Sequence, residues 1–225
     1  MVNKPAGLLT LPDGYDPQLP HLRSVLEPHF GRLWTVHRLD RETSGVILFA
    51  RNPEAHRALN TQFERHQIVK VYHALIAGNP PWDEQIINLP LRSNVGHRHR
   101  SVVDHKRGKP SITHLRVLER WRGYALIEAT PKTGRTHQIR SHLASLNLPI
   151  LVDPLYGDGQ PLLLSAFKGN YRKGKRPERP LLSRLGLHAR SLSFQNPANS
   201  ELVTVYAPHP KDFASTLRQL QKHGR

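Results

Sequence analysis

The chain has 225 residues, and its 33 Lys and Arg residues outnumber its 17 Asp and Glu residues, which gives a formal net charge of +16. It contains no cysteine, which excludes a disulfide-stapled scaffold, a Cys-liganded metal site and any thiol enzyme. The sequence has no apolar run of roughly 18 residues and no signal-peptide layout, so we expect a cytoplasmic protein without a membrane partner. The excess positive charge predicts a polyanionic partner, and nucleic acid is the first candidate.

Short strand-like runs alternate with short helix-like runs along the chain. Residues 46–50 form an apolar run between a glycine and an Asn-Pro pair, which predicts a buried strand. A helix is expected over 55–63, where apolar side chains recur at helical spacing. We expect further strands at 71–77, 112–118, 124–129, 187–194 and 202–206, and further helices at 136–146 and 213–220. Because strands outnumber helices and often follow one another directly, this order indicates an α+β fold with a mixed, mainly antiparallel central sheet flanked by helices.

Two segments concentrate the positive charge. Residues 92–109 carry six Lys or Arg against one Asp, and residues 168–184 carry seven against one Glu. A single charged run is usually solvated surface, but two of them in a chain of this net charge favour contact with nucleic acid. We therefore expect both segments to be basic loops that follow an RNA or DNA backbone.

The densest motif is His-Arg-Leu-Asp-Arg-Glu-Thr-Ser-Gly at 37–45, directly before the first expected strand. Asp40 lies between two arginines, and nearby guanidinium groups favour the ionised carboxylate. An ionised aspartate can act as a nucleophile or a base and is a poor general acid. An Arg-Asp-Arg cluster is more often a surface ion pair than an active site, so on these residues alone both a surface ion pair and a catalytic carboxylate stay open.

A second dense motif, Thr-Gly-Arg-Thr-His-Gln-Ile-Arg-Ser-His at 133–142, begins an expected helix. If Ile139 and Leu143 face the core, Arg140 lies at the edge of that apolar stripe, where a guanidinium can point into a cleft. Arg140 is then either an ordinary surface residue or the partner of a catalytic carboxylate.

Together these segments resemble the RluA-type pseudouridine synthases. The matching motifs, in the order of that family, lie at 2–8, 37–45, 70–74, 134–140, 153–157 and 187–189. The resemblance extends from residue 2 to about residue 208, and six motifs in order make it specific. It implies one catalytic domain over 1–225 with a basic active-site cleft and no S4-type RNA-binding domain.

Position by position, the resemblance implies three catalytic residues. Asp40 corresponds to the essential carboxylate of the family. Tyr72 corresponds to a tyrosine that stacks on the target base and is a proposed proton acceptor. Arg140 corresponds to the basic residue that pairs with the carboxylate.

The resemblance also implies contacts with the substrate. Arg38 corresponds to an arginine that occupies the space of the flipped nucleotide, and Leu187 is matched to a leucine that lines the pocket. Because Arg41 and His137 lie inside the two dense motifs, we expect them to contact the RNA as well.

The implied reaction converts specific uridines of a structured rRNA or tRNA stem-loop into pseudouridine. The N1–C1′ bond breaks, the base rotates, and a C5–C1′ bond forms. The reaction involves neither net redox change nor hydrolysis, so we expect no cofactor and no metal. We further expect the protein to act as a monomer.

Two alternatives remain at this level. One is an RNA-binding protein that keeps the fold and has lost catalysis, against which the joint presence of Asp40, Tyr72 and Arg140 argues. The other is a glycosidase that acts on nucleic acid. A glycosidase normally requires a pair of carboxyl groups, and the nearest second candidate, Glu128, reads as an ordinary strand residue.

Overall fold

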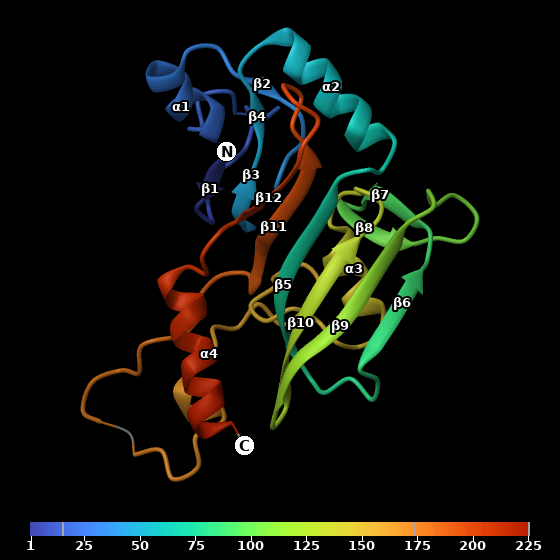
Figure 1. Cartoon of the computed structure of the whole chain (residues 1–225). Coiled ribbons are helices and arrows are strands. Elements are labelled where there is room, and N and C mark those ends of the chain that lie inside the picture. Colours follow the sequence, from blue (N-terminus) through green and yellow to red (C-terminus); the bar gives the residue numbers. More distant parts are fainter. Residues whose placement is uncertain (15, 173, 225) are drawn as a thin grey trace. The chain divides into compact units, whose positions relative to one another are not determined.

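The computed structural model describes every residue except 15, 173 and 225 (Figure 1). The chain divides into two compact units, and each unit combines segments that are distant in sequence. The first unit comprises Met1–Tyr72 and His188–Pro208, and the second comprises His73–Leu187 and His209–Arg225. None of the helices formed by the described residues is long and apolar enough to cross a membrane.

The first unit is built on a set of paired strands, namely β1 (Val2–Lys4), β3 (Ser44–Ile47), β11 (Leu187–Gln195) and β12 (Leu202–Tyr206). β1 pairs antiparallel with β3, and β12 pairs antiparallel with β11. β3 and β11 run parallel, with His188 opposite Ser44. The unit also contains α1 (Leu22–Phe30), α2 (Pro53–Glu64), and a small sheet formed by β2 (Trp34–Thr35) and β4 (Phe49–Ala50).

Local sequence explains where α2 begins. The side chain of Asn52 accepts a hydrogen bond from the backbone N–H of Ala55, and Pro53 occupies the first helical turn, where no intrahelical donor is needed. Leu59 lies on the buried face of the helix, in the core of the first unit. The expected helix over 55–63 is therefore confirmed.

The expected strand over 46–50 is wrong in one respect, because the apolar run is divided between β3 and β4. The break falls at Leu48, whose backbone N–H donates to Nε2 of His37 (3.0 Å). A side chain thus takes the hydrogen bond that a strand partner would otherwise supply, and the two halves join different sheets.

The second unit contains the strand order β5-β10-β9-β6, in which β9 and β10 form a long antiparallel hairpin (Figure 1). These strands are β5 (Val69–Ala77), β6 (Glu84–Asn88), β9 (Ile112–Trp121) and β10 (Tyr124–Pro131). β5 begins in the first unit and ends in the second. The helices are α3 (Gln138–Ser145), a short 3₁₀ turn η1 (Leu164–Ala166), and α4 (Lys211–His223). The core includes Leu75, Leu126, Leu182, Phe213 and Leu220.

The sheet pairing confirms the α+β class and the mixed, mainly antiparallel arrangement that the sequence predicts. The strands expected at 71–77, 112–118, 124–129, 187–194 and 202–206 are all present, several of them longer than expected. The helices expected at 136–146 and 213–220 are α3 and α4.

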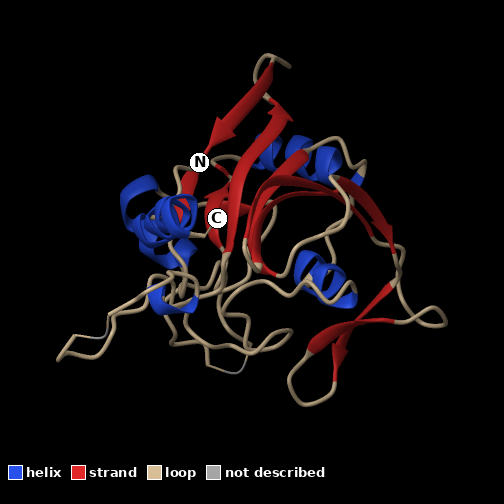
Figure 2. Cartoon of the chain, turned by 90° about the horizontal axis from the view of Figure 1, so that it is seen from below, coloured by secondary structure: helices blue, strands red, loops and turns tan. Residues whose placement is uncertain are grey.

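The two basic segments differ in structure. Residues 92–109 largely form the hairpin of β7 (Leu91–Val95) and β8 (Arg100–Val103), so the expectation of a loop is wrong there. Buried side chains at the two ends of the hairpin, Leu91 and Ser101, hold it to the protein. Residues 168–184 contain no helix or strand among their described members (Figure 2).

Candidate active site

Asp40 lies in a tight turn between β2 and β3, which we call the Asp40 loop (residues 37–45). The backbone N–H of Thr43 donates to the carbonyl oxygen of Asp40 (3.1 Å) and closes the turn. The neighbouring residue Leu39 is buried, and its backbone is held by Thr10, whose hydroxyl donates to the Leu39 carbonyl (2.9 Å) and accepts from the Leu39 N–H (3.2 Å). Leu39 thus anchors the loop to the core of the first unit, and the side chain of Asp40 is half-buried.

A buried lysine braces the same loop. Lys4 is 0% exposed, and its Nζ donates to the carbonyl oxygens of Pro5 (2.9 Å), Leu8 (2.7 Å) and Arg41 (3.0 Å). The backbone N–H of Gly7 also donates to the Arg41 carbonyl (2.9 Å). Sequence reasoning recognised the motif at 2–8 but assigned it no role, and the structure shows that it positions the loop that carries Asp40.

The other side of the loop is fixed by the contact between β3 and β11. Gly45 has a positive φ of 119°, and a Cβ at this position would overlap the backbone of Ala189. The imidazole of His188 is completely buried, with Nδ1 2.9 Å from the hydroxyl oxygen of Ser44 and Nε2 3.2 Å from the carbonyl oxygen of Ala207. Only glycine at position 45 therefore lets β3 approach β11 this closely, and the buried His188 links Ser44 to the backbone of Ala207.

Tyr72 lies within reach of the charge of Asp40. Both residues belong to the first unit, and the ring of Tyr72 packs against its core. Burial, and then the negative charge of Asp40, raise the pKa of Tyr72 above its ordinary value. The phenol is therefore neutral at physiological pH and can stack on a ring or donate a hydrogen bond.

Burial also lowers the pKa values of two further titratable groups, Lys70 and the loop residue His37. Burial lowers the pKa of Lys70 to about 8, and burial together with the nearby Lys70 lowers the pKa of His37 to about 3. His37 stacks on Phe63, with ring centroids 4.8 Å apart. Its Nε2 accepts the hydrogen bond from Leu48, so the neutral ring carries its proton on Nδ1.

The two arginines on either side of Asp40 are both exposed but differ in their contacts. The guanidinium of Arg41 donates from Nε to the carbonyl oxygen of Gly7 (3.1 Å) and lies 3.7 Å from a carboxylate oxygen of Glu42. Arg38 forms no hydrogen bond or ion pair with the residues that the structure describes. Of the two, Arg38 is therefore the less restrained side chain.

Arg140 lies deeper than its sequence pattern indicates. It is 4% exposed, and its guanidinium pairs with the fully buried carboxylate of Asp153 through Nε to Oδ2 (2.7 Å) and Nη2 to Oδ1 (2.8 Å). The alternative that Arg140 is an ordinary surface residue is therefore wrong, because the residues of α3 from Gln138 to Leu143 are all buried. Asp153 belongs to a recognised motif, but nothing in its spacing identifies its partner.

The loop that leads into α3 is tied to β9 by one glutamine. Oε1 of Gln138 accepts from the hydroxyl of Thr133 (2.7 Å) and from the backbone N–H of Arg135 (3.0 Å). Its Nε2 donates to the carbonyl oxygen of Ile112 and to the hydroxyl oxygen of Thr113, both at 2.9 Å. All the polar atoms of this buried amide are bonded, so the start of α3 is held in one place.

Tyr156 connects Arg140 to the hairpin that carries the first basic segment. Its ring lies under the guanidinium of Arg140, 5.1 Å from centroid to Cζ. Its hydroxyl accepts from the backbone N–H of Ser101 in β8 (2.6 Å) and is 3.1 Å from Nδ1 of His137. His137 adopts a left-handed backbone with φ of 53°, which is uncommon outside glycine. His137 thus lies beside Arg140, as expected of two residues of one motif.

The expected site residues divide between the two units. Asp40, Tyr72, Arg38 and Arg41 come together in the first unit, whereas Arg140, His137 and Leu187 belong to the second. Leu187 is 4% exposed and begins β11. Among the described residues there is no cluster of three or more His, Cys, Asp or Glu side chains that could hold a metal ion.

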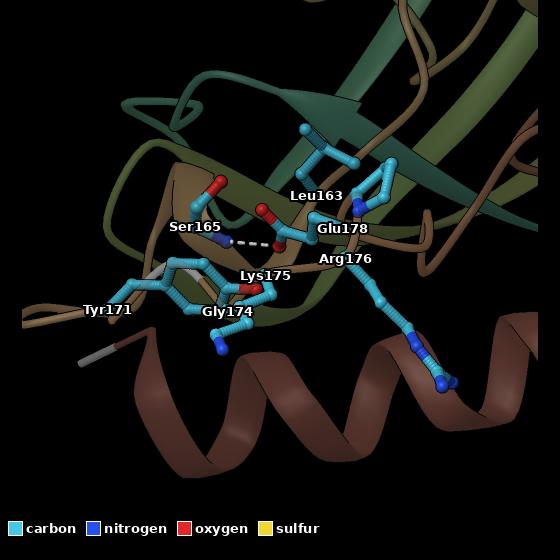
Figure 3. A pocket seen from close by; sticks show the side chains of 8 residues that line it. Leu163, Ser165, Tyr171, Gly174, Lys175, Arg176 and Glu178 are labelled. Atoms are coloured by element: carbon cyan, nitrogen blue, oxygen red, sulfur yellow. Dashed lines mark hydrogen bonds between the residues drawn. The ribbon is translucent and has the colours of Figure 1, made fainter.

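The second basic segment encloses a cavity of about 450 Å³ (Figure 3). It is lined by Leu163, Ser165, Tyr171, Gly174, Lys175, Arg176, Pro177 and Glu178. A carboxylate oxygen of Glu178 accepts from the backbone N–H of Ser165 (2.8 Å), while the side chain of Arg176 extends away from the ring of Tyr171. The wall thus offers an aromatic ring, cations and an acceptor on one surface.

Comparison with known proteins shows the family of the chain. The family model described as RNA pseudouridylate synthase matches residues 1–145. The chain belongs to the RNA pseudouridylate synthase family. Its activity is that of an RNA pseudouridine synthase, which is an isomerase, and the resemblance seen in the sequence motifs is confirmed.

Individual members of this family align over most of the chain. The chain is 35% identical over 209 residues to the dual-specificity RNA pseudouridine synthase RluA of Pasteurella multocida, covering 92% of this chain and 88% of that protein. It is also 35% identical over 231 residues to ribosomal large subunit pseudouridine synthase D of Neisseria meningitidis, covering 98% of this chain and 58% of that protein. The solved structure of human RNA pseudouridylate synthase domain containing 1 superposes with a TM-score of 0.70 at 28% identity, covering 93% of this chain and 79% of that one.

Proposed function

We propose that this pseudouridine synthase isomerises specific uridines of a structured RNA, with Asp40 as the essential carboxylate. The observation that carries the proposal is the construction of the Asp40 loop. Hydrogen bonds from the buried side chains of Lys4 and Thr10 fix the backbone on both sides of Asp40, and the neutral Tyr72 lies within reach of its charge. A surface ion pair, the alternative left open by the sequence, would not require such support.

In this proposal Asp40 acts on the sugar or the base while the N1–C1′ bond breaks. The freed uracil, which keeps the electron pair of the broken bond, rotates and its C5 bonds to C1′. The hydrogen on C5 leaves as a proton and N1 takes up a proton, so the reaction is an isomerisation with no net change in atoms. Because the pKa of Tyr72 is raised, its hydroxyl stays protonated at neutral pH. This supports a role for Tyr72 in stacking on the base and donating a hydrogen bond, and it argues against a phenolate base.

Arg140 is the third catalytic residue of the proposal, as the basic partner that the family resemblance assigns to the carboxylate. Arg38 would fill the space that the flipped uridine leaves, which fits its exposure on the Asp40 loop. Leu187, Arg41 and His137 remain proposed substrate contacts.

The proposed substrate is a stem-loop of rRNA or tRNA. The names of the matched relatives support this class, since one is a dual-specificity RNA enzyme and another acts on the large ribosomal subunit. We propose that the chain is a single catalytic domain that acts as a monomer in the cytoplasm and needs no cofactor. Size-exclusion chromatography and cell fractionation would test the oligomeric state and the location.

The decisive experiment uses RNA labelled with tritium at C5 of uridine. The wild-type protein should release tritium without free uracil, and Asp40→Asn should abolish the release while RNA binding persists. Glu64→Gln, an exposed carboxylate in the same unit, is the control and should match the wild type. Free uracil would favour a glycosidase, and binding without any tritium release would favour an inactive RNA-binding protein.

We also propose that the second basic segment binds the RNA backbone. Lys173 lies outside the described residues, but Lys175 and Arg176 line the cavity and supply positive charge. Replacing both with Gln should weaken RNA binding and flatten its dependence on salt concentration, by roughly one unit of the logarithmic slope for each lost phosphate contact. An unchanged slope would remove this segment from the interface.

A further inference from the structure

The carboxylate of Asp153 is held in place independently of its arginine partner. Its Oδ1 accepts from the backbone N–H groups of Leu155 (2.9 Å) and Tyr156 (3.1 Å). The backbone carbonyl of Asp153 accepts from the N–H of Gly157 (2.9 Å), which closes the same turn. Asp153 therefore has a defined orientation that its own turn imposes, and Arg140 docks against a fixed acceptor.

The backbone on both sides of this ion pair is strained. Val152, directly before Asp153, has a φ of 58°, a conformation that is a genuine outlier for a β-branched residue. His137, three residues before Arg140, also has a left-handed backbone. Strain of this kind persists only where the surrounding structure enforces it, and it concentrates at functional sites. Here it lies directly before Asp153 and three residues before Arg140.

The guanidinium of Arg140 is restrained in two directions. Asp153 binds the edge formed by Nε and Nη2 in the plane of the group, and the ring of Tyr156 covers a face. The Tyr156 ring is itself anchored by the backbone N–H of Ser101. A planar group bound along one edge and on one face has little rotational freedom left, so the direction of its remaining atoms is set.

A buried ion pair is poor evidence of a purely stabilising role, because the loss of hydration can offset the attraction between the charges. We propose that Asp153 is a positioning residue, which holds the Arg140 guanidinium in the orientation that pseudouridine formation requires. This inference rests on the proposed catalytic role of Arg140.

The chain contains a matched control for this arrangement. Arg184 and Asp212 form the same bidentate pair in the same unit, with Nε to Oδ2 at 2.7 Å and Nη2 to Oδ1 at 2.8 Å. Neither residue is a proposed catalytic residue, but Arg184 ends the second basic segment, so RNA affinity is measured separately from the rate. The Arg184–Asp212 pair is more exposed than the Arg140–Asp153 pair, so it controls for the loss of a bidentate ion pair and not for the loss of a buried one. A double-mutant cycle between Asp153 and Arg140 controls for burial.

The test measures single-turnover tritium release at saturating enzyme, and RNA affinity separately. Asp153→Asn keeps the shape of the side chain and its acceptor for the turn but loses the charge and one acceptor for Arg140. We expect its rate to fall roughly 100-fold, as for a misplaced group in an active site, with RNA affinity within about twofold of the wild type. Asp212→Asn should react within about twofold of the wild-type rate. Equal rates for Asp153→Asn and the wild type would overturn the proposal.

A double-mutant cycle separates positioning from a general structural effect. If Asp153 acts through Arg140, Asp153→Asn should slow the Arg140→Lys enzyme by less than about threefold, because the guanidinium it positions is already gone. If instead the rate reduction of the double variant equals the product of the two single reductions, Asp153 acts independently of Arg140, and the proposal is overturned.

Two further measurements address a variant that does not fold and a failure of the proposed function itself. If Asp153→Asn does not fold, Asp153→Glu, which keeps the charge and displaces the carboxylate by one methylene, takes its place, and a wild-type rate would again exclude positioning. Asp40→Asn is assayed in parallel. Activity retained in Asp40→Asn would refute the proposed function itself, whereas an inactive Asp40→Asn beside a fully active Asp153→Asn would refute only the present inference.

Discussion

The two groups of proposed catalytic residues, one in each unit, are held in different ways. The Asp40 loop is braced through its backbone, since Lys4 and Thr10 bind the carbonyl oxygens of Arg41 and Leu39. The Arg140 site, consisting of Arg140, Asp153 and Tyr156, is held through a side chain, because the carboxylate and the ring contact the guanidinium itself.

The two regions therefore differ in what is positioned: the path of a backbone in one, and the orientation of a side-chain group in the other. Bonds to main-chain atoms determine where a loop runs, and so they place Asp40 as part of a turn. Bonds to a guanidinium determine where one functional group points. We expect substitutions in the first region to act on the stability of a turn and of its strand contacts, and substitutions in the second to act on a buried charge.

The largest effect on stability should follow Arg140→Met. It leaves the Asp153 carboxylate buried without its cation, which typically costs about 3–5 kcal/mol. Arg184→Met is the comparison, and it should cost only about 1 kcal/mol because the side chain of Asp212 is 37% exposed and can be hydrated. Urea unfolding measures both, and equal losses would show that burial does not distinguish the two pairs.

Gly45→Ala should follow, at about 3 kcal/mol. The new methyl group would overlap the Ala189 backbone and would need a left-handed conformation, so β3 and β11 must separate. Gly169→Ala, which meets only open space, should change the free energy of unfolding by less than about 1 kcal/mol. A small effect at Gly45 would mean that the loop tolerates movement and is less precisely held than the Arg140 site.

Lys4→Met should cost about 2 kcal/mol, since three partly buried carbonyl oxygens lose the charged donor that the buried Lys4 supplies. The exposed Lys132→Met provides the control, with an expected change within about 0.5 kcal/mol. Denaturant titration of both variants tests the backbone brace directly. A neutral Lys4→Met would show that other contacts suffice to hold the Asp40 loop.

The smallest predicted effect depends on pH and concerns His37. Its pKa is about 3 in the folded protein against 6.5 for the ordinary group, because of burial and then Lys70. Between these values the unfolded chain binds a proton that the folded chain excludes, so the free energy of unfolding falls as the pH falls. The loss should be at most about 1.4 kcal/mol per pH unit below pH 6.5, and absent above it.

His37→Gln should remove this contribution. The test compares urea unfolding of the variant and the wild type near neutral pH and near about pH 5.5, where the wild type should have lost about 1 kcal/mol more than the variant. Parallel pH curves for the two proteins would mean that His37 binds its proton equally in both states.

Elements with a strong apolar pattern could be predicted from the sequence. The apolar stripes of α2, α3 and α4 and the long apolar strands β9, β10 and β11 all form where expected. The short elements were not predicted, since β6 has a single buried side chain, Ile87, and α1 buries only Leu22 and contains Pro28. Elements that bury so little carry a weak hydrophobic pattern.

The prediction of the site from sequence motifs was also incomplete. Sequence motifs determined by themselves the family and its candidate residues Asp40, Tyr72 and Arg140, because each motif is a short run whose order survives without the fold. Only the tertiary structure decided that Arg140 is buried against Asp153, and that Lys4 reaches across 37 positions to the carbonyl oxygen of Arg41. The physical reason is that a buried charge must be satisfied by whichever acceptors the folded chain brings to it, and spacing along the chain does not reveal them.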